Sequence, residues 1–275
     1  MTTPQSLSDR LSVLSDRNFK YLMIAPAILI LLLVGLFPLI YSLVVSFQNI
    51  TNRPTALYLR PLVFGCDDVL GDRPSTQYKM VLLGVVLDLT EAGRRKRLEV
   101  LITDQFVRAA SGGVGTAKVP GNYGAGMLAR RAAAEYGCDQ VLWLDAGRRR
   151  WVEELGSMNV MFQLGGTLVT PSLTDTILAG VTRSTLLALA RDHGLDCEER
   201  PIALEEITAA MSWKGLTQAL GCGTAVGVAS INAFHLGERT LALPPATPVA
   251  DRLRALLSDV QQGRAEDVRG WLTPV

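Results

Sequence analysis

Hydrophobic positions along the chain form one long uninterrupted run and many short ones. No charged residue occurs between Lys20 and Arg53, and residues 21–47 are almost entirely apolar. A helix needs about 20 apolar residues to cross a bilayer. We therefore predict a polar segment over residues 1–20 and a single transmembrane helix over residues 21–50. The alternative is a helix buried in a soluble core, which is less typical of a run this long.

The charges beside this run give a slight orientation bias. Arg10, Arg17 and Lys20 precede it, whereas Arg53 and Arg60 follow it. Because basic residues favour the cytoplasmic side, this bias predicts a cytoplasmic N-terminus and places the rest of the chain across the membrane.

After residue 54 the apolar runs are short and alternate between two periods. Strands bounded by glycine or polar residues are expected at 56–64, 80–89, 98–102, 141–144, 159–164, 167–170 and 225–231. Helices are expected at 125–136, 182–193, 204–211 and 249–261. Gly165-Gly166 falls between two strands and predicts a hairpin turn. This mixture indicates an α+β or α/β domain.

Composition removes several classes of function. The formal net charge is +1, so no electrostatic argument favours nucleic acid. The four cysteines are scattered, which is typical of reduced thiols and not of a disulfide framework. The two histidines, His193 and His235, supply too little for a histidine-based metal centre or a Ser-His-Asp triad. We therefore expect no metal.

Lys118 is the most informative single residue. It is the only charged residue from Ala109 to Ala129, in a glycine-rich segment ahead of a predicted helix. Partial desolvation of its ammonium there would favour the neutral, nucleophilic amine. Such a lysine suits covalent binding of a phosphate-bearing aldehyde cofactor. The alternative is a surface lysine in a flexible loop.

Four further features match such a cofactor. Glu154 precedes a glycine turn in an apolar stretch, where a carboxylate would suit a pyridine nitrogen. A helix start at Gly180-Val181-Thr182 and a turn at 222–225 offer amides and hydroxyls to a phosphate. Arg60 lies in an apolar strand, where a buried guanidinium would need a phosphate or a carboxylate. A surface glutamate, an ordinary N-cap and an ordinary turn are the alternatives for the first three.

The order of these motifs resembles the branched-chain amino acid aminotransferases. The matching segments run from about residue 55 to the C-terminus: Tyr58-Leu-Arg60-Pro61, the lysine loop with Asn122-Tyr123, 137–145, 154–159, 180–183, 222–225 and 260–272. Residues 17–52 instead resemble the first membrane helix of carbohydrate ABC-transporter permeases, although no later apolar run is long enough for another span.

The resemblance implies a pyridoxal 5′-phosphate enzyme of the D-amino acid aminotransferase-like fold, fold type IV. A truncated small domain would occupy residues 55–108, and the cofactor-binding large domain residues 109–275. The implied reaction is transamination of leucine, isoleucine or valine with 2-oxoglutarate or glutamate. A homodimer working in the cytoplasm is also implied, which conflicts with the charge bias.

The resemblance also assigns roles to individual residues. Lys118 would bind the cofactor covalently and then move a proton between substrate Cα and cofactor C4′. Glu154 would pair with the pyridine nitrogen and Tyr123 with the phenolic oxygen. The phosphate would be held by Arg60, Val181, Thr182 and Thr224. Ser157 and Ala225 would lie beside the substrate carboxylate.

The chain departs from the family pattern at several points. Pro120 and Ala179 stand where the family has glycine and proline, and the permease-like segment stands where the family's small domain begins. Alternatives on the same fold are a D-amino acid aminotransferase and an aminodeoxychorismate lyase. A non-catalytic membrane-anchored protein and a permease fragment are alternatives of other classes.

Overall fold

A computed structural model describes residues 55–68, 71–88 and 97–273. The polar segment at 1–20 and the transmembrane helix at 21–50 that we predicted lie outside these residues. Within the described ranges, no helix combines the length and the apolar character that a membrane span requires. The chain divides into two compact units, Met1–Thr90 and Glu91–Val275, which are treated separately below.

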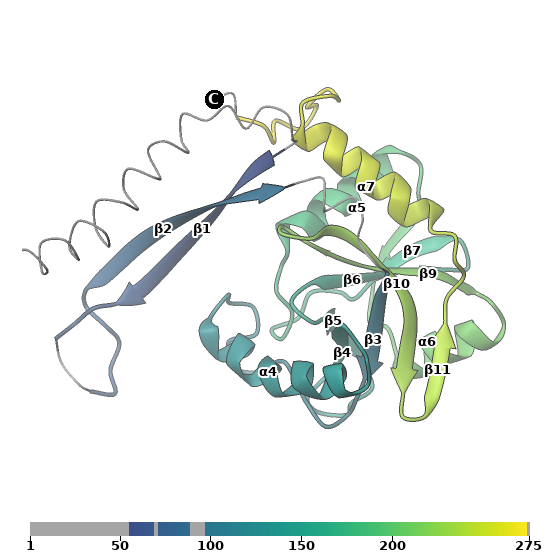
Figure 1. The fold of residues 1–275 in the computed structure, drawn as a ribbon, viewed down its shortest axis with the longest axis horizontal. Helices are drawn as coiled ribbons and strands as arrows, with labels where there is room; N and C mark the ends of the chain where they lie inside the picture. The colour runs from purple at the N-terminus through teal and green to yellow at the C-terminus, as the bar shows by residue number, and fades with distance from the viewer. Residues whose placement is uncertain (1–54, 69–70, 89–96, 274–275) are drawn as a thin grey trace, which may run out of the picture. The chain divides into compact units, whose positions relative to one another are not determined.

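The described part of the smaller unit is a two-stranded antiparallel ribbon. Strand β1 (Thr55–Gly65) pairs with β2 (Tyr78–Asp88) (Figure 1). In their register Arg60 lies opposite Leu83. Large apolar side chains of both strands are exposed in this unit, among them Leu57 and Met80. Two paired strands bury little apolar surface by themselves. For this reason a stable sheet generally needs a third strand or a helix packed against one face.

The larger unit is built on a nine-stranded mixed sheet with the order β5-β4-β3-β10-β9-β6-β7-β8, and β11 pairs with β10. Its strands are β3 (Leu98–Ile102), β4 (Gln140–Leu144), β5 (Val152–Leu155), β6 (Asn159–Leu164), β7 (Thr167–Thr170), β8 (Cys197–Glu199), β9 (Leu216–Gly223), β10 (Gly227–Leu236) and β11 (Arg239–Ala242). Its helices are α4 (Pro120–Glu135), α5 (Val181–Asp192), α6 (Leu204–Ser212) and α7 (Pro248–Gln261).

Strand β3 belongs to this sheet, where it pairs in parallel with both β4 and β10. We expected it in the smaller domain, because the predicted boundary was at residues 108/109. The compact units instead divide between Thr90 and Glu91. The physical reason is that, among the described residues, β3 pairs its backbone with β4 and β10 of the larger unit.

The core of the larger unit follows the two faces of the sheet. Strand β6 is buried on both faces: Val160 and Phe162 enter one apolar cluster, whereas Met161 enters another with α5 and α7. This division is the period of two that a strand imposes on its side chains. Figure 1 shows α5 and α7 packed against each other over the sheet, while α4 lies against β4.

Most of the predicted elements are confirmed, and three differences from the prediction have clear causes. Helix α4 starts at Pro120, five residues before the predicted start, because proline suits the first turn, where its missing N–H is not needed. Strand β5 was not predicted, because it begins Val152-Glu153-Glu154 and two adjacent charged residues interrupt an apolar strand pattern. Strand β9 contains Gly221 and Gly223, which interrupt its apolar pattern.

Phe162 tests this account of the core. It is fully buried, and its ring centroid lies 6.3 Å from that of Phe234. We expect Phe162→Ala to lower the free energy of unfolding by about 3–5 kcal/mol, since it removes a large buried ring. Met127→Ala, on the exposed side of α4, should change it by about 0.5 kcal/mol or less. Urea unfolding followed by tryptophan fluorescence measures both; equal effects would contradict the assigned core.

Candidate functional site

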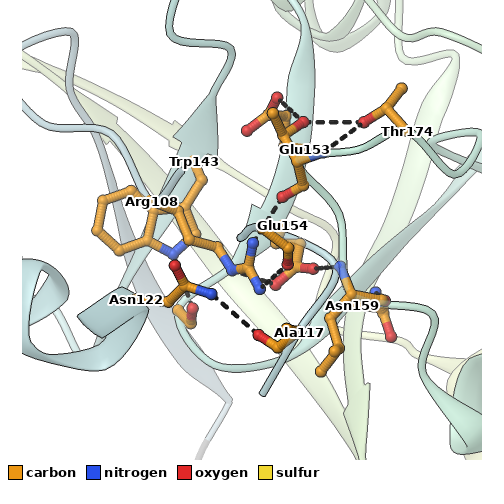
Figure 2. A network of polar contacts seen from close by, with 12 residues as sticks. Arg108, Ala117, Asn122, Trp143, Glu153, Glu154, Asn159 and Thr174 are labelled. Atoms are coloured by element: carbon orange, nitrogen blue, oxygen red, sulfur yellow. Dashed lines mark hydrogen bonds and ion pairs between the residues drawn. The ribbon is translucent and has the colours of Figure 1, made fainter. Parts of the chain in front are cut away.

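Lys118 lies at the end of the loop that leads into α4. The loop carbonyls of Val114 and Ala117 accept hydrogen bonds from Asn122 Nδ2, at 2.9 and 3.0 Å. This amide ties the first turn of the helix back to the loop (Figure 2). The side chain of Lys118 is exposed, so the expected partial desolvation is wrong for this conformation. A single loop ahead of a helix does not enclose a side chain.

The middle of the lysine loop is pinned to the segment before α5. Asp175 Oδ2 accepts hydrogen bonds from Ser111 Oγ at 2.7 Å and from the Gly112 N–H at 2.8 Å. Gly115 packs so closely that a Cβ there would lie 2.5 Å from Thr176 Cα. Only glycine fits at this approach. The position of Lys118 is therefore set from both sides of its loop.

The central polar contact of the site is a buried ion pair between Arg108 and Glu154. The exposed fractions of the two residues are 8% and 2%, and Arg108 Nε lies 2.8 Å from Glu154 Oε2. The other carboxylate oxygen, Oε1, accepts a hydrogen bond from the backbone N–H of Leu178. Figure 2 shows the guanidinium facing this carboxylate. The expected buried carboxylate before the glycine turn is thus present.

Burial dominates the electrostatics of the two adjacent glutamates. Desolvation raises the pKa of Glu154 to about 7, although Arg108 and the Leu178 amide both oppose the rise. Desolvation also raises the pKa of Glu153, whose Oε1 accepts a 2.5 Å hydrogen bond from Thr176 Oγ1. Since Glu153 adds a like charge beside it, Glu154 needs a nearby cation to stay ionised at neutral pH.

Helix α5 starts three residues after Leu178, whose amide binds Glu154, and its first amides have no side-chain cap. Gly180 is the N-cap and makes no side-chain cap hydrogen bond. Asn159 Nδ2 donates to the Leu178 carbonyl at 2.9 Å, and a Cβ at Gly180 would lie 2.0 Å from Asn159 Oδ1. Val181 is exposed and Thr182 half-buried. The first amides of this helix can therefore receive an anion.

Two turns at the same end of the sheet carry the remaining predicted residues of this unit. In the β6–β9 register Asn159 lies opposite Cys222. This pairing brings the β5–β6 turn with Ser157 beside the β9–β10 turn with Thr224 and Ala225. All three of these turn residues are exposed. The sheet thus collects side chains and amides from distant parts of the chain.

Arg60 differs from the expectation. It is exposed on the β1–β2 ribbon, and its guanidinium lies 5.4 Å from the centre of the Tyr58 ring. The predicted burial is wrong, because among the described residues of its unit the two strands have no further layer packed against them. Arg60 belongs to the smaller unit and Lys118 to the larger one. Tyr123 is partly exposed on α4, in the larger unit.

Sequence reasoning missed three residues that build the site. Arg108 precedes the lysine loop, Asn122 follows it, and Asn159 starts β6. In the sequence, Asn122 and Asn159 were noted only as parts of motifs, without a role, and nothing pointed to Arg108.

Glu153 and Thr176 also line a cavity of about 560 Å³, together with Trp151 and Pro171. Lys118 is not among the residues that line this cavity.

Comparison with known sequences supports one family. The family described as amino-transferase class IV matches residues 44–234. The branched-chain-amino-acid aminotransferase of Mycobacterium tuberculosis (strain ATCC 25618 / H37Rv) is 40% identical over 223 residues, which are 79% of this chain and 61% of that protein. The branched-chain-amino-acid transaminase 1 of Bacillus subtilis (strain 168) is 37% identical over 227 residues, 82% of this chain and 64% of that protein.

Solved structures agree with the sequence matches. The branched-chain amino acid aminotransferase from Thermobaculum terrenum in its PLP-form has a TM-score of 0.63 and 26% identity, covering 79% of this chain and 68% of that one. The enzyme from Escherichia coli has a TM-score of 0.64 and 23% identity, covering 79% and 68%, and this likeness supports the fold alone. The α+β fold type IV architecture and the resemblance inferred from the motifs are confirmed.

The buried carboxylate gives a pH test. Below about pH 4.5 Glu154 is protonated in both folded and unfolded chains. Between about pH 4.5 and 7 this carboxyl group is ionised in the unfolded chain but still protonated in the folded one. The contribution of Glu154 to the free energy of unfolding therefore declines as the pH rises. We expect the free energy of unfolding of the wild type relative to Glu154→Gln to fall by on the order of 3 kcal/mol from pH 4.5 to 7.5.

Urea unfolding at a series of pH values measures this difference. Glu135→Gln is the matched control, because Glu135 is exposed on α4 and pairs only at 3.8 Å with Arg131. The difference between this control and the wild type should not change over the same range. A Glu154→Gln difference that is independent of pH would contradict the burial of this carboxyl group.

Proposed function

Because this chain belongs to the class IV aminotransferases, we propose that it transfers amino groups between branched-chain L-amino acids and 2-oxoglutarate with bound pyridoxal 5′-phosphate. The single observation that carries the proposal is a buried carboxylate, Glu154, in the same unit as a lysine loop that is pinned on both sides. The names of the similar proteins support the substrate class. The chain spans 61–64% of those two relatives, so its activity remains our proposal.

The donor set of the larger unit fits the cofactor. Glu154 accepts one hydrogen bond on each oxygen from the contacts described, and a carboxylate oxygen has a second lone pair for a pyridine N–H. The start of α5 and the Thr224 hydroxyl supply neutral donors suited to a phosphate. A Cβ at Gly180 would fill the close approach between this helix start and Asn159.

Each residue then has a definite task. When bound, the cofactor accepts the electron pair that is released at substrate Cα. Lys118 Nζ binds the cofactor and moves the proton at substrate Cα. Glu154 holds a proton on the ring nitrogen, and Tyr123 donates to the phenolic oxygen. Proton transfer at Cα is thus the role of Lys118, whereas Glu154 and Tyr123 stabilise charge on the cofactor ring.

The remaining contacts orient the two ligands. Val181, Thr182 and Thr224 bind the phosphate, the first two through backbone amides. Ser157 and the Ala225 amide orient the substrate carboxylate. The phosphate role that the resemblance gives to Arg60 stays a prediction, because Arg60 belongs to the other unit. The homodimer expected from the resemblance stays a prediction.

Lys118→Ala tests the cofactor assignment. We expect the variant to stay folded but to lose covalent trapping of pyridoxal phosphate by borohydride, because no other lysine of the described residues lies in this loop. Lys214→Ala is the matched control, since Lys214 is exposed in the turn after α6. Peptide mass mapping locates the label, and leucine with 2-oxoglutarate measures turnover. A label retained in Lys118→Ala would contradict the assignment; turnover of D-alanine but not leucine would favour the alternative reaction on this fold.

We also propose that residues 21–50 anchor the chain in a membrane, on the evidence of their uncharged apolar sequence. After expression, full-length protein should remain in the membrane fraction through alkaline carbonate washing. A chain lacking residues 1–50 should move to the supernatant. Retention of the shortened chain would show that another segment binds the membrane.

A further inference from the structure

We propose that Arg108 is a positioning residue of the cofactor site, which holds the Glu154 carboxylate ionised and oriented toward the ring nitrogen and clamps the Lys118 loop to it. This role rests on the proposed function. Arg108 is not needed to touch substrate or cofactor; it acts through the two groups that do.

The contacts of the guanidinium carry the first step. Its three nitrogens each bind a different segment of the chain: Nε lies 2.8 Å from Glu154 Oε2, Nη1 donates to the Thr176 carbonyl at 2.6 Å, and Nη2 donates to the Gly115 carbonyl at 3.0 Å. The planar fork of arginine fixes the relative positions of these acceptors. Strand β5, the segment before α5 and the lysine loop therefore share one rigid group.

The charge of Arg108 carries the second step. Glu154 is 2% exposed and lies next to the buried Glu153, so both burial and a like charge favour its neutral form. Its other partner, the Leu178 N–H, is uncharged. A neutral carboxyl group cannot hold a protonated ring nitrogen by charge. Arg108 supplies the cation that opposes protonation of Glu154.

The loop contact carries the third step. Gly115 is three residues before Lys118, and its carbonyl is bound to the same guanidinium as Glu154. Gly115 also packs against Thr176, whose carbonyl is the third acceptor. A displacement of Arg108 therefore moves the base and the carboxylate together. A lysine in place of Arg108 would keep the positive charge but would lack the planar guanidinium that binds several acceptors at once.

The experiment compares two cofactors with the full-length protein. Binding is measured for pyridoxal phosphate and for its 1-deaza analogue, in which a C–H group replaces the ring nitrogen. We expect Arg108→Met to lower the affinity for pyridoxal phosphate at least tenfold and the affinity for the analogue about threefold or less. The reason is that only pyridoxal phosphate has a ring nitrogen that can use the charge of Glu154. Arg108→Lys should retain most of the preference for the ring nitrogen. Arg131→Met, an exposed arginine of α4, is the control and should leave both affinities unchanged.

Hydrogen exchange without cofactor tests the clamp separately. Amides of residues 111–118 should exchange at least tenfold faster in both Arg108 variants than in the wild type and in Arg131→Met. If Arg108→Met alone does not fold, because it leaves a buried charge unpaired, the double variant Arg108→Met/Glu154→Gln removes that charge. It should then bind both cofactors with nearly equal affinity.

Three results would overturn the proposal in distinguishable ways. Equal losses of affinity for both cofactors in Arg108→Met would mean that Arg108 does not act through Glu154. Unchanged exchange in residues 111–118 would remove the clamp. A wild-type protein that binds no pyridoxal phosphate would overturn the proposed function itself, and the role of Arg108 with it.

Discussion

The candidate site of this protein depends on a charge pair removed from water. Taking a carboxylate out of water costs several kcal/mol unless a cation and hydrogen bonds compensate. Glu154 receives that compensation from Arg108 on one oxygen and from the Leu178 amide on the other. Because Arg108 also binds the carbonyls of Gly115 and Thr176, the pair determines where the lysine loop lies. The same guanidinium therefore both opposes protonation of Glu154 and holds the lysine loop in place.

The sheet supplies the second constraint by collecting short turns at one end. Strand β6 starts at Asn159, which faces Cys222 of β9 and contacts the segment ahead of α5. The glycine at the start of α5 lets this helix approach Asn159 more closely than any larger residue allows. Neutral donors thus lie in the same unit as a charged carboxylate, which is a suitable arrangement for a ligand with a phosphate at one end and a cationic ring at the other.

The groups of this arrangement all belong to the larger unit. Lys118 and Glu154 belong to the larger unit, as do both segments that we propose to bind the phosphate, and that unit has its own apolar clusters. Arg60 lies in the smaller unit, on a ribbon whose large side chains are exposed within that unit. The cofactor proposal therefore rests mainly on residues 97–273. The proposal for substrate choice rests on the similarity to longer proteins.

The sequence by itself determined the local elements and the family. Gly165-Gly166, both with positive φ, marked the β6–β7 turn, and the apolar periodicity located α5 and α7 within a residue. The order of the lysine, glutamate and glycine motifs was specific enough to identify the aminotransferase resemblance. Such signals are local in the chain, so one sequence is sufficient to read them.

Only the tertiary structure decided which of these groups are buried and what they contact. Arg108 and Glu154 are 46 residues apart, and no periodicity links them. The structure decided that Glu154 is buried and is not a surface glutamate, and it buried Glu153 beside it. It left exposed Arg60 and Lys118, which we expected to be shielded. Burial depends on the layers that pack over a residue, and those layers come from strands and helices far away in the sequence. Ion pairing follows from that packing, so it is determined at the same level.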